Sequence, residues 1–338
     1  MNKVLVTGGA GYIGSHTVVE LLEAGFNPII VDNFENSDRS VLEKLKLLTR
    51  KNITFYEGDF GDSRLLTEVI KNENVSSIIH FAAYKAVGES VKNPLKYYQN
   101  NVSGLINLLR IIGNFNVSSF VFSSSCTVYG EAKILPITEN EEIKPASSPY
   151  GSTKQMDETI IKDFVLASNS LKVASLRYFN PIGAHPSSLI GELPLGIPAN
   201  LVPFVTQTAA GIRKELVING NDYPTPDGTC IRDYIHVVDL AKAHVNALRH
   251  LLNQKEGYYD TFNIGTGKGS SVLEVIKSFE KTTGKKVTYK IGPRRQGDII
   301  SAYAAVDKAK SILEWQPTLS LEDALRDAWN WQQSISRT

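Results

Sequence analysis

The fold is decided near the N-terminus by the stretch Val4-Leu5-Val6-Thr7-Gly8-Gly9-Ala10-Gly11-Tyr12-Ile13-Gly14. Its apolar first half is typical of a short buried strand, and its second half fits G-x-G-x-x-G from Gly9 and T-G-x-x-G-x-x-G from Thr7. An amphipathic stretch over Ser15–Ala24 follows and predicts a helix. Strand, glycine loop and helix in this order predict the first unit of a doubly wound parallel α/β sheet that binds a dinucleotide.

The glycine loop carries the chemistry of phosphate binding. Glycines permit a tight turn and a close backbone approach, and the N-terminus of the following helix attracts a pyrophosphate. Asp32 lies about 20 residues further on, at the expected end of the second strand, where a carboxylate accepts from both hydroxyls of a ribose. The same charge repels a 2′-phosphate, so the pattern favours NAD over NADP. A nucleoside-triphosphate loop is excluded because Ser15, rather than lysine, follows Gly14.

The first half of the chain repeats this alternation of strand and helix, which is typical of βαβ units. Strands are expected over Lys3–Thr7, Pro28–Asp32, Thr54–Glu57, Ser77–Phe81, Ser119–Ser123 and Val173–Arg177. Helices are expected over Ser15–Ala24, Ser40–Thr49, Ser63–Asn72, Tyr97–Phe115 and Tyr150–Ser168. Right-handed crossovers between such strands predict a doubly wound (Rossmann) sheet.

The composition changes after Phe179. Prolines and glycines crowd residues 180–200 and predict a long surface excursion where a second lobe begins. We expect an NAD-binding domain over residues 1–179 and a smaller α/β substrate lobe over residues 180–338, with a terminal helix around Leu321–Gln332. The segment over about 235–265 is a candidate for returning to the first domain.

Charge and cysteine content exclude several classes of function. The 338 residues hold 36 Lys and Arg against 35 Asp and Glu, so a basic surface for nucleic acid is not expected. Two cysteines, Cys126 and Cys230, make no disulfide framework and favour a reducing compartment. With no signal sequence and no apolar run of about 18 residues, we expect a cytoplasmic protein that does not bind membranes. The histidines show no metal-ligand spacing, so no metal is expected.

A second motif lies at Tyr150 and Lys154, which are four residues apart and so neighbours on one helix face. A nearby ammonium stabilises phenolate and makes tyrosine a usable base. Because Tyr and Lys often share a solvated helix face, the pair alone is a weak signal. It is strengthened by Ser123-Ser124-Ser125 at the end of an expected strand, since strand carboxyl ends border the ligand crevice. A hydroxyl there can hold a reacting oxygen while the tyrosine moves its proton.

With these motifs in place, the chain resembles the extended short-chain dehydrogenase/reductase family, and within it the UDP-glucose 4-epimerases. The likeness runs from Lys3 to about Gln332. It rests on the glycine loop and on the blocks Gly14-Ser15-His16-Thr17, His80-Phe81-Ala82-Ala83, Lys85-Ala86-Val87-Gly88-Glu89-Ser90, Ser123-Ser124-Ser125, Tyr178-Phe179-Asn180-Pro181, Asn221-Asp222-Tyr223-Pro224-Thr225 and Arg232-Asp233-Tyr234-Ile235-His236-Val237.

The resemblance implies a role for individual residues. The implied catalytic residues are Tyr150, Lys154 and Ser125. NAD would be bound by Gly8, Gly11, Tyr12, Ile13, Gly14, Asp32, Asn33, Asn36, Ser37, Asp59, Phe60, Phe81, Ala82, Ala83, Lys85, Asn100, Lys154, Tyr178 and Phe179. The UDP-sugar would be bound by Ser125, Tyr150, Asn180, Asn200, Leu201, Val217, Asn219, Arg232, Arg295, Asp298 and Ala302. A forked guanidinium matches diphosphate oxygens, which suits the two arginines.

The implied activity is reversible epimerisation at C4 of UDP-glucose and UDP-galactose, by transient oxidation to a 4-keto sugar. A small residue, Ala302, follows Arg295-Gln296-Gly297-Asp298 where hexose-restricted members carry tyrosine, which implies activity on UDP-GlcNAc and UDP-GalNAc as well. A homodimer formed through the helices at Tyr97–Phe115 and Tyr150–Ser168 is also implied.

Two other functions remain open at this point. A nucleotide-sugar 4,6-dehydratase needs an acid and a base where this chain has Cys126-Thr127. A non-catalytic NAD or nucleotide-sugar sensor would gain nothing from an activated phenol, but the fold permits it.

Overall fold

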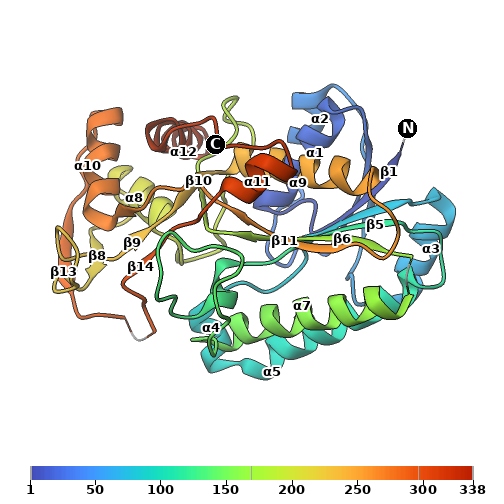
Figure 1. Cartoon of the computed structure of the whole chain (residues 1–338). Coiled ribbons are helices and arrows are strands. Elements are labelled where there is room, and N and C mark those ends of the chain that lie inside the picture. The colour runs from blue at the N-terminus through green and yellow to red at the C-terminus, as the bar shows by residue number, and fades with distance from the viewer. Residues whose placement is uncertain (1, 169, 296, 337–338) are drawn as a thin grey trace.

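The computed structural model describes residues 2–168, 170–295 and 297–336, and a seven-stranded sheet lies at its centre (Figure 1). The strand order is β11-β6-β5-β4-β1-β2-β3, and the pairings are parallel. The doubly wound parallel sheet is therefore confirmed. The strands are β1 (Lys3–Thr7), β2 (Asn27–Asp32), β3 (Thr54–Glu57), β4 (Ser77–His80), β5 (Ser119–Ser123), β6 (Lys172–Tyr178) and β11 (Tyr259–Ile264).

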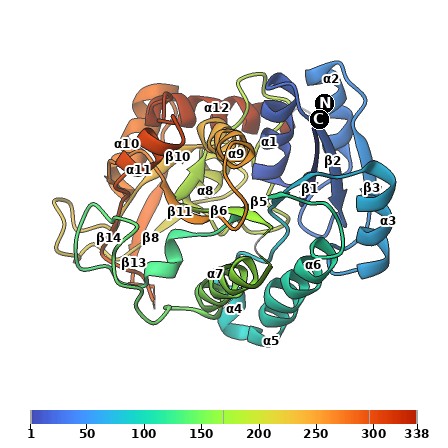
Figure 2. The same ribbon diagram turned by 45° about the vertical axis from the view of Figure 1, so that its right-hand side comes forward.

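Helices cover both faces of this sheet (Figure 2). One face carries α1 (Tyr12–Glu23), α2 (Ser40–Thr49), α9 (Val237–Leu252) and α11 (Asp307–Ile312). The other face carries α3 (Ser63–Glu73), α6 (Gly104–Ile112) and α7 (Pro149–Ser168). The short helices α4 (Val87–Lys92) and α5 (Pro94–Tyr97) pack against α7 (Figure 1). Among the described residues, none of the helices combines the length and the apolarity needed to cross a bilayer.

The β1 strand explains the two-sided core. Its side chains alternate between the faces, so Val4 and Val6 pack into the core under α1 and α9, while Leu5 packs into the core over α6 and α7. All three side chains are fully buried. A strand covered on both faces must be apolar throughout, which is why a continuous hydrophobic run precedes the glycine loop.

Most predicted boundaries agree with the structure within a few residues, and α1 shows why one differs. The helix begins at Tyr12 rather than Ser15, because the amide of Ser15 already donates to the carbonyl of Gly11 at 2.9 Å. The end of the glycine motif, Tyr12-Ile13-Gly14, thus forms the first turn of the helix. The terminal helix α12 (Leu321–Ile335) runs three residues beyond the predicted Gln332.

The predicted continuous helix over Tyr97–Phe115 is wrong. The structure has α5, then a π-helical turn over Tyr98–Ser103, then α6, which ends at Ile112. The turn brings the Asn101 amide inward, where its oxygen accepts from the Tyr84 amide at 3.0 Å and its nitrogen donates to the Thr153 hydroxyl at 3.1 Å. Hydrophobic periodicity does not reveal such a tertiary hydrogen bond, and π-helical turns are common beside functional sites.

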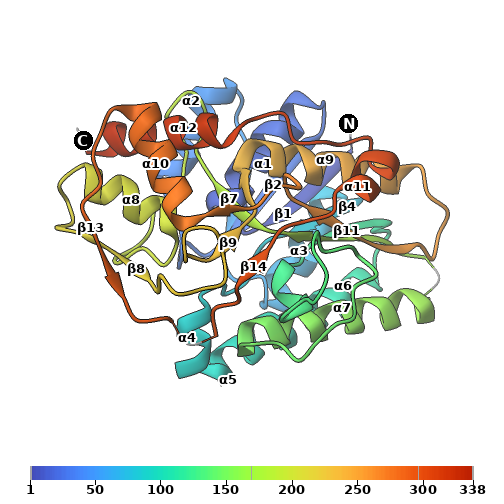
Figure 3. The same ribbon diagram turned by 60° about the vertical axis from the view of Figure 1, so that its left-hand side comes forward.

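The second half of the chain divides its elements between the sheet and a smaller lobe (Figure 3). Two elements that follow β7, α8 and β8 in sequence belong to the central sheet layer: β11 pairs with β6, and α9 packs against α1. The lobe holds the small sheets β10-β7, β12-β9-β14 and β13-β8. Its elements are β7 (Asn180–Ile182), β8 (Leu216–Asn219), β9 (Ile231–Arg232), β10 (Tyr234–His236), β12 (Ser270–Ser271), β13 (Tyr289–Gly292), β14 (Ser301–Ala302), α8 (Leu201–Ala209), α10 (Val272–Thr283) and α12. The two-domain boundary at residue 179 stays a prediction.

Candidate active site

A cavity of about 370 Å³ lies at the carboxyl ends of the central strands. Its lining includes every residue predicted for NAD except Phe179, and two predicted for the sugar, Tyr150 and Asn200. Phe179 is instead buried in a cluster with Val128 and Ala302. The parallel sheet explains this gathering, because strand carboxyl ends meet at one edge and their loops form the crevice.

The glycine loop forms the floor of the cavity and packs too tightly for side chains. A Cβ on Gly14 would lie 2.2 Å from the carbonyl oxygen of Gly8. Gly8 itself has a φ of +72°, which other residues rarely adopt. The first turn of α1 has no side-chain cap, so backbone amides at its start remain available to donate hydrogen bonds to an anion in the cavity. This backbone cradle suits the pyrophosphate of a dinucleotide.

Asp32 closes the cavity at the end of β2. Its carboxylate accepts from the amide of Ala10, the amide of Phe34 and the hydroxyl of Ser37, each at 2.9 Å. These bonds fix the carboxylate while leaving acceptor capacity, since its two oxygens offer about four lone-pair sites. The arrangement fits a ribose diol, so the residues present fit the dinucleotide that the glycine loop predicts.

Tyr150 and Lys154 lie in the first turns of α7, which starts with Pro149, a favourable first helical residue. The ammonium of Lys154 donates to the carbonyl of Ser123 at 3.0 Å and lies 4.5 Å from the centre of the Phe122 ring. Both contacts come from the end of β5, so they fix the lysine beside the crevice. Tyr150 is 6% exposed and Lys154 is 3% exposed.

Burial dominates the protonation of this pair. It raises the pKa of Tyr150 above its ordinary value, and a hydrogen bond with Ser125 opposes that shift. Burial also lowers the pKa of Lys154, against the attraction of Asp157 and Glu158. The phenol therefore keeps its proton unless positive charge in the crevice stabilises the phenolate.

Ser125 is held in place by the short 3₁₀ turn over Cys126–Tyr129 that follows β5. Its hydroxyl oxygen accepts from the amide of Thr127 at 3.2 Å and from the hydroxyl of Thr127 at 3.0 Å. The serine hydroxyl keeps its own proton to donate. It therefore lies beside Tyr150 as an oriented hydrogen-bond donor.

A buried ion pair that sequence reasoning missed supports this loop. Glu158 and Arg177 meet at 2.6 Å and 3.0 Å, with both side chains 6% exposed. The hydroxyl of Ser124 donates to the same carboxylate at 2.6 Å, and Arg177 also donates to the Tyr129 hydroxyl at 3.0 Å. The available signal was an arginine inside a strand that was expected in the buried central sheet, since a buried charge requires a partner.

Comparisons with known proteins identify the family. The family model described as GDP-mannose 4,6 dehydratase matches residues 5–328. The chain is 51% identical over 331 residues to the UDP-glucose 4-epimerase of Bacillus subtilis (strain 168), covering 98% of this chain and 97% of that protein. The chain belongs to the UDP-glucose 4-epimerase family. The resemblance inferred from the sequence motifs is thus confirmed.

Solved structures of the family agree closely with this fold. An epimerase structure from Stenotrophomonas maltophila, with bound NAD and formylated UDP-arabinopyranose, has a TM-score of 0.97 at 46% identity, over 100% of this chain and 99% of that one. One from Bifidobacterium longum, with NAD+ and UDP, has a TM-score of 0.96 at 48% identity, over 99% of each chain. The chain also spans 49% of the length of a bifunctional protein from Pachysolen tannophilus, at 51% identity.

The remaining residues predicted for the sugar of this epimerase family lie in the lobe or at the sheet edge, outside the described lining of the cavity. Asp298 joins two of them, because its carboxylate lies 2.6 Å from Arg295 and 3.6 Å from Arg232. The others are Ser125, Asn180, Leu201, Val217, Asn219 and Ala302. Gln296, inside the block that precedes Ala302, lies outside the described residues.

The cavity is also lined by residues that were not predicted, among them Glu35, Tyr84 and Glu192, whose side chains make polar contacts with other residues of the lining. The Glu192 carboxylate accepts from the Asn200 amide at 2.6 Å and lies 3.9 Å from the Lys85 ammonium. Glu192 thus connects Lys85, predicted for NAD, with Asn200, predicted for the sugar. A single glutamate in a proline-rich stretch gave no sequence signal for this contact.

Proposed function

We propose that Tyr150, Lys154 and Ser125 carry the reversible C4 epimerisation of UDP-hexoses that this enzyme catalyses with NAD. The observation that carries the proposal is their convergence at the end of β5, beside a glycine loop that fits a dinucleotide. Bound NAD supplies the acceptor and donor of hydride at C4 of the hexose.

In this proposal Tyr150 moves the proton of the C4 hydroxyl. Burial holds its phenol in the protonated form, and the ammonium of Lys154, together with the positive charge of oxidised nicotinamide, lowers its pKa to the working range. Ser125 donates to the reacting oxygen and orients it. After oxidation, the 4-keto sugar turns over in the pocket, and Tyr150 returns the proton when hydride arrives on the other face.

The sugar can turn only if its nucleotide stays anchored. We assign this anchoring to the lobe, where Arg232 and Arg295 flank Asp298 and present guanidinium groups suited to a diphosphate. Val217 and Asn219 alternate outward on β8 and are both exposed, so they offer the same face to a ligand. Residues 1–179 would then serve mainly NAD, and residues 180–338 mainly the UDP-sugar.

We also propose that the enzyme accepts N-acetylated UDP-hexoses. Ala302 is 2% exposed and belongs to a cluster with Phe179 and Cys126, so a tyrosine at this position would displace its neighbours, whereas alanine adds no bulk next to the sugar. The ring of the neighbouring Tyr303 lies beside Gly269 instead.

The dehydratase alternative is not favoured by the groups next to Ser125. Burial raises the pKa of the Cys126 thiol to about 11, so the thiol is neutral and a poor base at physiological pH. The Thr127 hydroxyl is already engaged with Ser125. A sensor needs no proton transfer, so the sensor alternative does not explain the buried pair of Tyr150 and Lys154.

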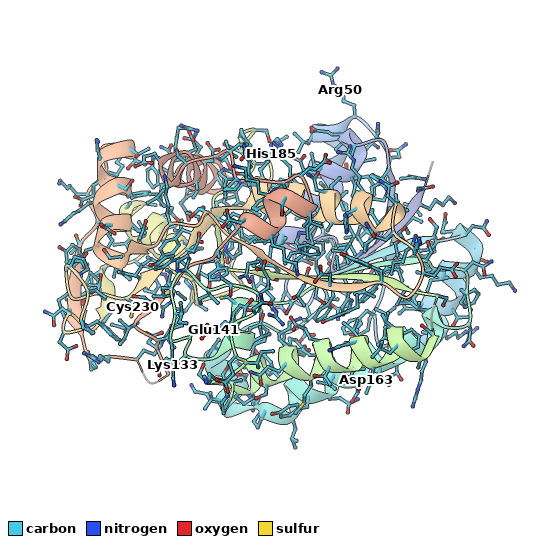
Figure 4. All side chains as sticks on the ribbon, viewed as in Figure 1. Arg50, Lys133, Glu141, Asp163, His185 and Cys230 are labelled. Atoms are coloured by element: carbon cyan, nitrogen blue, oxygen red, sulfur yellow. The ribbon has the colours of Figure 1, made fainter. Side chains whose placement is uncertain are left out.

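We further propose a homodimer in the cytoplasm. Of the two helices expected at the interface, over Tyr97–Phe115 and Tyr150–Ser168, the second exposes the apolar side chains of Met156 and Leu166. Val91 and Leu95 are exposed on the adjoining α4 and α5, and a second copy would cover this surface. Cys126 and Cys230 are both free thiols, and Cys230 lies in the smaller lobe (Figure 4). Free thiols fit a reducing compartment.

Product analysis tests the proposal. The purified protein is incubated with UDP-galactose and UDP-N-acetylgalactosamine in parallel, while absorbance reports transient reduced nicotinamide. Epimerisation of both substrates supports the proposal. Conversion of UDP-galactose alone would reject the N-acetyl assignment, and binding without conversion of either would favour the sensor.

A further inference from the structure

One hydrogen bond joins two loops that no strand pairing connects. The Tyr84 hydroxyl donates to the Glu35 carboxylate at 2.6 Å. Tyr84 follows β4 and Glu35 follows β2, and in the sheet β1 lies between these two strands (β1, β2 and β4 are labelled in Figure 3).

The bond therefore crosses above the carboxyl end of β1, where the glycine loop begins. Adjacent strands are about 4.8 Å apart, so the two loops start roughly 10 Å from each other. Both Tyr84 and Glu35 line the same cavity as the glycine loop and Asp32. A dinucleotide lying over the glycine loop would pass beneath this bond.

The Tyr84 side of the bridge is anchored. Its backbone amide donates to the Asn101 side chain at 3.0 Å, and its backbone carbonyl accepts from the same side chain at 3.0 Å. The Lys96 ammonium lies 4.1 Å from the centre of the Tyr84 ring and 3.6 Å from the Glu35 carboxylate. A second carboxylate, Glu89, holds Lys96 at 3.0 Å. The π-helical turn that carries Asn101 thus fixes one half of the bridge.

The Glu35 side is the more exposed half of the bridge. Its side chain is 45% exposed, and its loop is held locally by the Asn33 side chain, which accepts from the Glu35 amide at 3.0 Å. An outward movement of this loop would break the Tyr84 bond and the 3.6 Å contact with Lys96, but no pairing between strands of the sheet. Burial and the Glu35 charge both raise the pKa of Tyr84, so its hydroxyl remains a donor across the physiological pH range.

We propose that Tyr84 and Glu35 form a latch that closes over the bound dinucleotide and slows its release. The inference rests on the dinucleotide site of the proposed function and adds the feature that retains the cofactor between turnovers. An enzyme whose cofactor is regenerated in each cycle gains from such retention. Neither residue of the latch is among those assigned to the sugar or to proton transfer, so the expected effect is on cofactor exchange.

The test is the rate of NAD release from the purified holoprotein. Protein loaded with radiolabelled NAD is mixed with excess unlabelled NAD, and retained label is followed with time. Tyr84→Phe removes the donor and Glu35→Ala removes the acceptor of a hydrogen bond to a charged group. Each variant should release label about tenfold faster, and the partial exposure of the bond places the expected effect at the lower end of the range for such bonds.

A matched control is Tyr56→Phe, which removes a tyrosine–glutamate hydrogen bond of 2.7 Å between β3, the edge strand of the sheet, and Glu73 at the end of α3. It should leave release unchanged. The double variant Tyr84→Phe/Glu35→Ala should release NAD no faster than Glu35→Ala alone, because that single variant already lacks the bond to Tyr84 and the contact with Lys96. Additive effects, or release at the wild-type rate in both single variants, would overturn the latch. Wild-type protein that binds no NAD would instead reject the dinucleotide site itself.

Discussion

Replacing Tyr150 with phenylalanine removes one hydroxyl and leaves the ring in its buried place. The ring is 6% exposed, so its packing is kept and the fold should lose only the hydrogen bond with Ser125. The Lys154 contacts with Ser123 and Phe122 do not involve the hydroxyl, so NAD binding should persist. General acid–base catalysis contributes about 10²–10⁴-fold, or roughly 3–5 kcal/mol of barrier, and turnover should fall by that factor.

The assay is the conversion of UDP-galactose by wild type and variant, with bound NAD measured in each preparation. Tyr259→Phe is a matched control, because that hydroxyl lies on β11 and contacts Ser175 at 3.5 Å rather than the crevice. It should keep wild-type turnover. A Tyr150→Phe enzyme that retains more than about a third of the wild-type kcat would move the base elsewhere.

Three further changes test other parts of the account. Asp32→Ala removes the ribose acceptor and the charge that repels a 2′-phosphate. The affinity for NAD should drop about tenfold or more, and the ratio of the dissociation constants of NADP and NAD should decrease. An unchanged ratio would refute the assignment. Ala302→Tyr should abolish conversion of UDP-N-acetylgalactosamine and spare UDP-galactose, and loss of both activities at unchanged stability would contradict the pocket assignment. Burial lowers the pKa of His80 from 6.5 to about 3, so the unfolded state takes up the proton first and the free energy of unfolding falls as pH drops below about 6.5. At pH 5.5 His80 contributes about 1.4 kcal/mol to this fall, and other histidines whose pKa is lowered by burial, such as His16 and His244, add to it. Urea unfolding at pH 7.5 and pH 5.5 isolates the His80 contribution as the difference in pH dependence between wild type and a His80→Gln variant.

The parts of the fold that sequence predicted are those set by local pattern. The alternation of Val4, Leu5 and Val6 between two cores needs only an apolar strand covered on both faces. The break between α5 and α6 depends instead on Asn101 reaching Tyr84 and Thr153, residues distant in sequence. The small lobe sheets likewise depend on pairings between strands of two to four residues, such as β9 with β14, whose length carries little periodicity.

The candidate site divides in the same way. Motif residues such as Asp32 and Lys154 could be found because their chemistry is tied to a fixed spacing from a glycine loop or a tyrosine. Glu158, Arg177 and Glu192 could not be assigned, since their roles follow from partners that only the folded chain brings within 3 Å. Residues that support a site are therefore the ones that the structure adds.

The central claim is that C4 of the sugar is oxidised and reduced again within one active site. The most direct measurement uses UDP-galactose carrying deuterium at C4, with no NAD added, and follows the label into UDP-glucose by mass spectrometry and NMR. The account predicts conversion with the deuterium still at C4, because the hydride leaves and returns to the same carbon. Absence of conversion, or product in which the C4 deuterium has been replaced by solvent hydrogen, would contradict it.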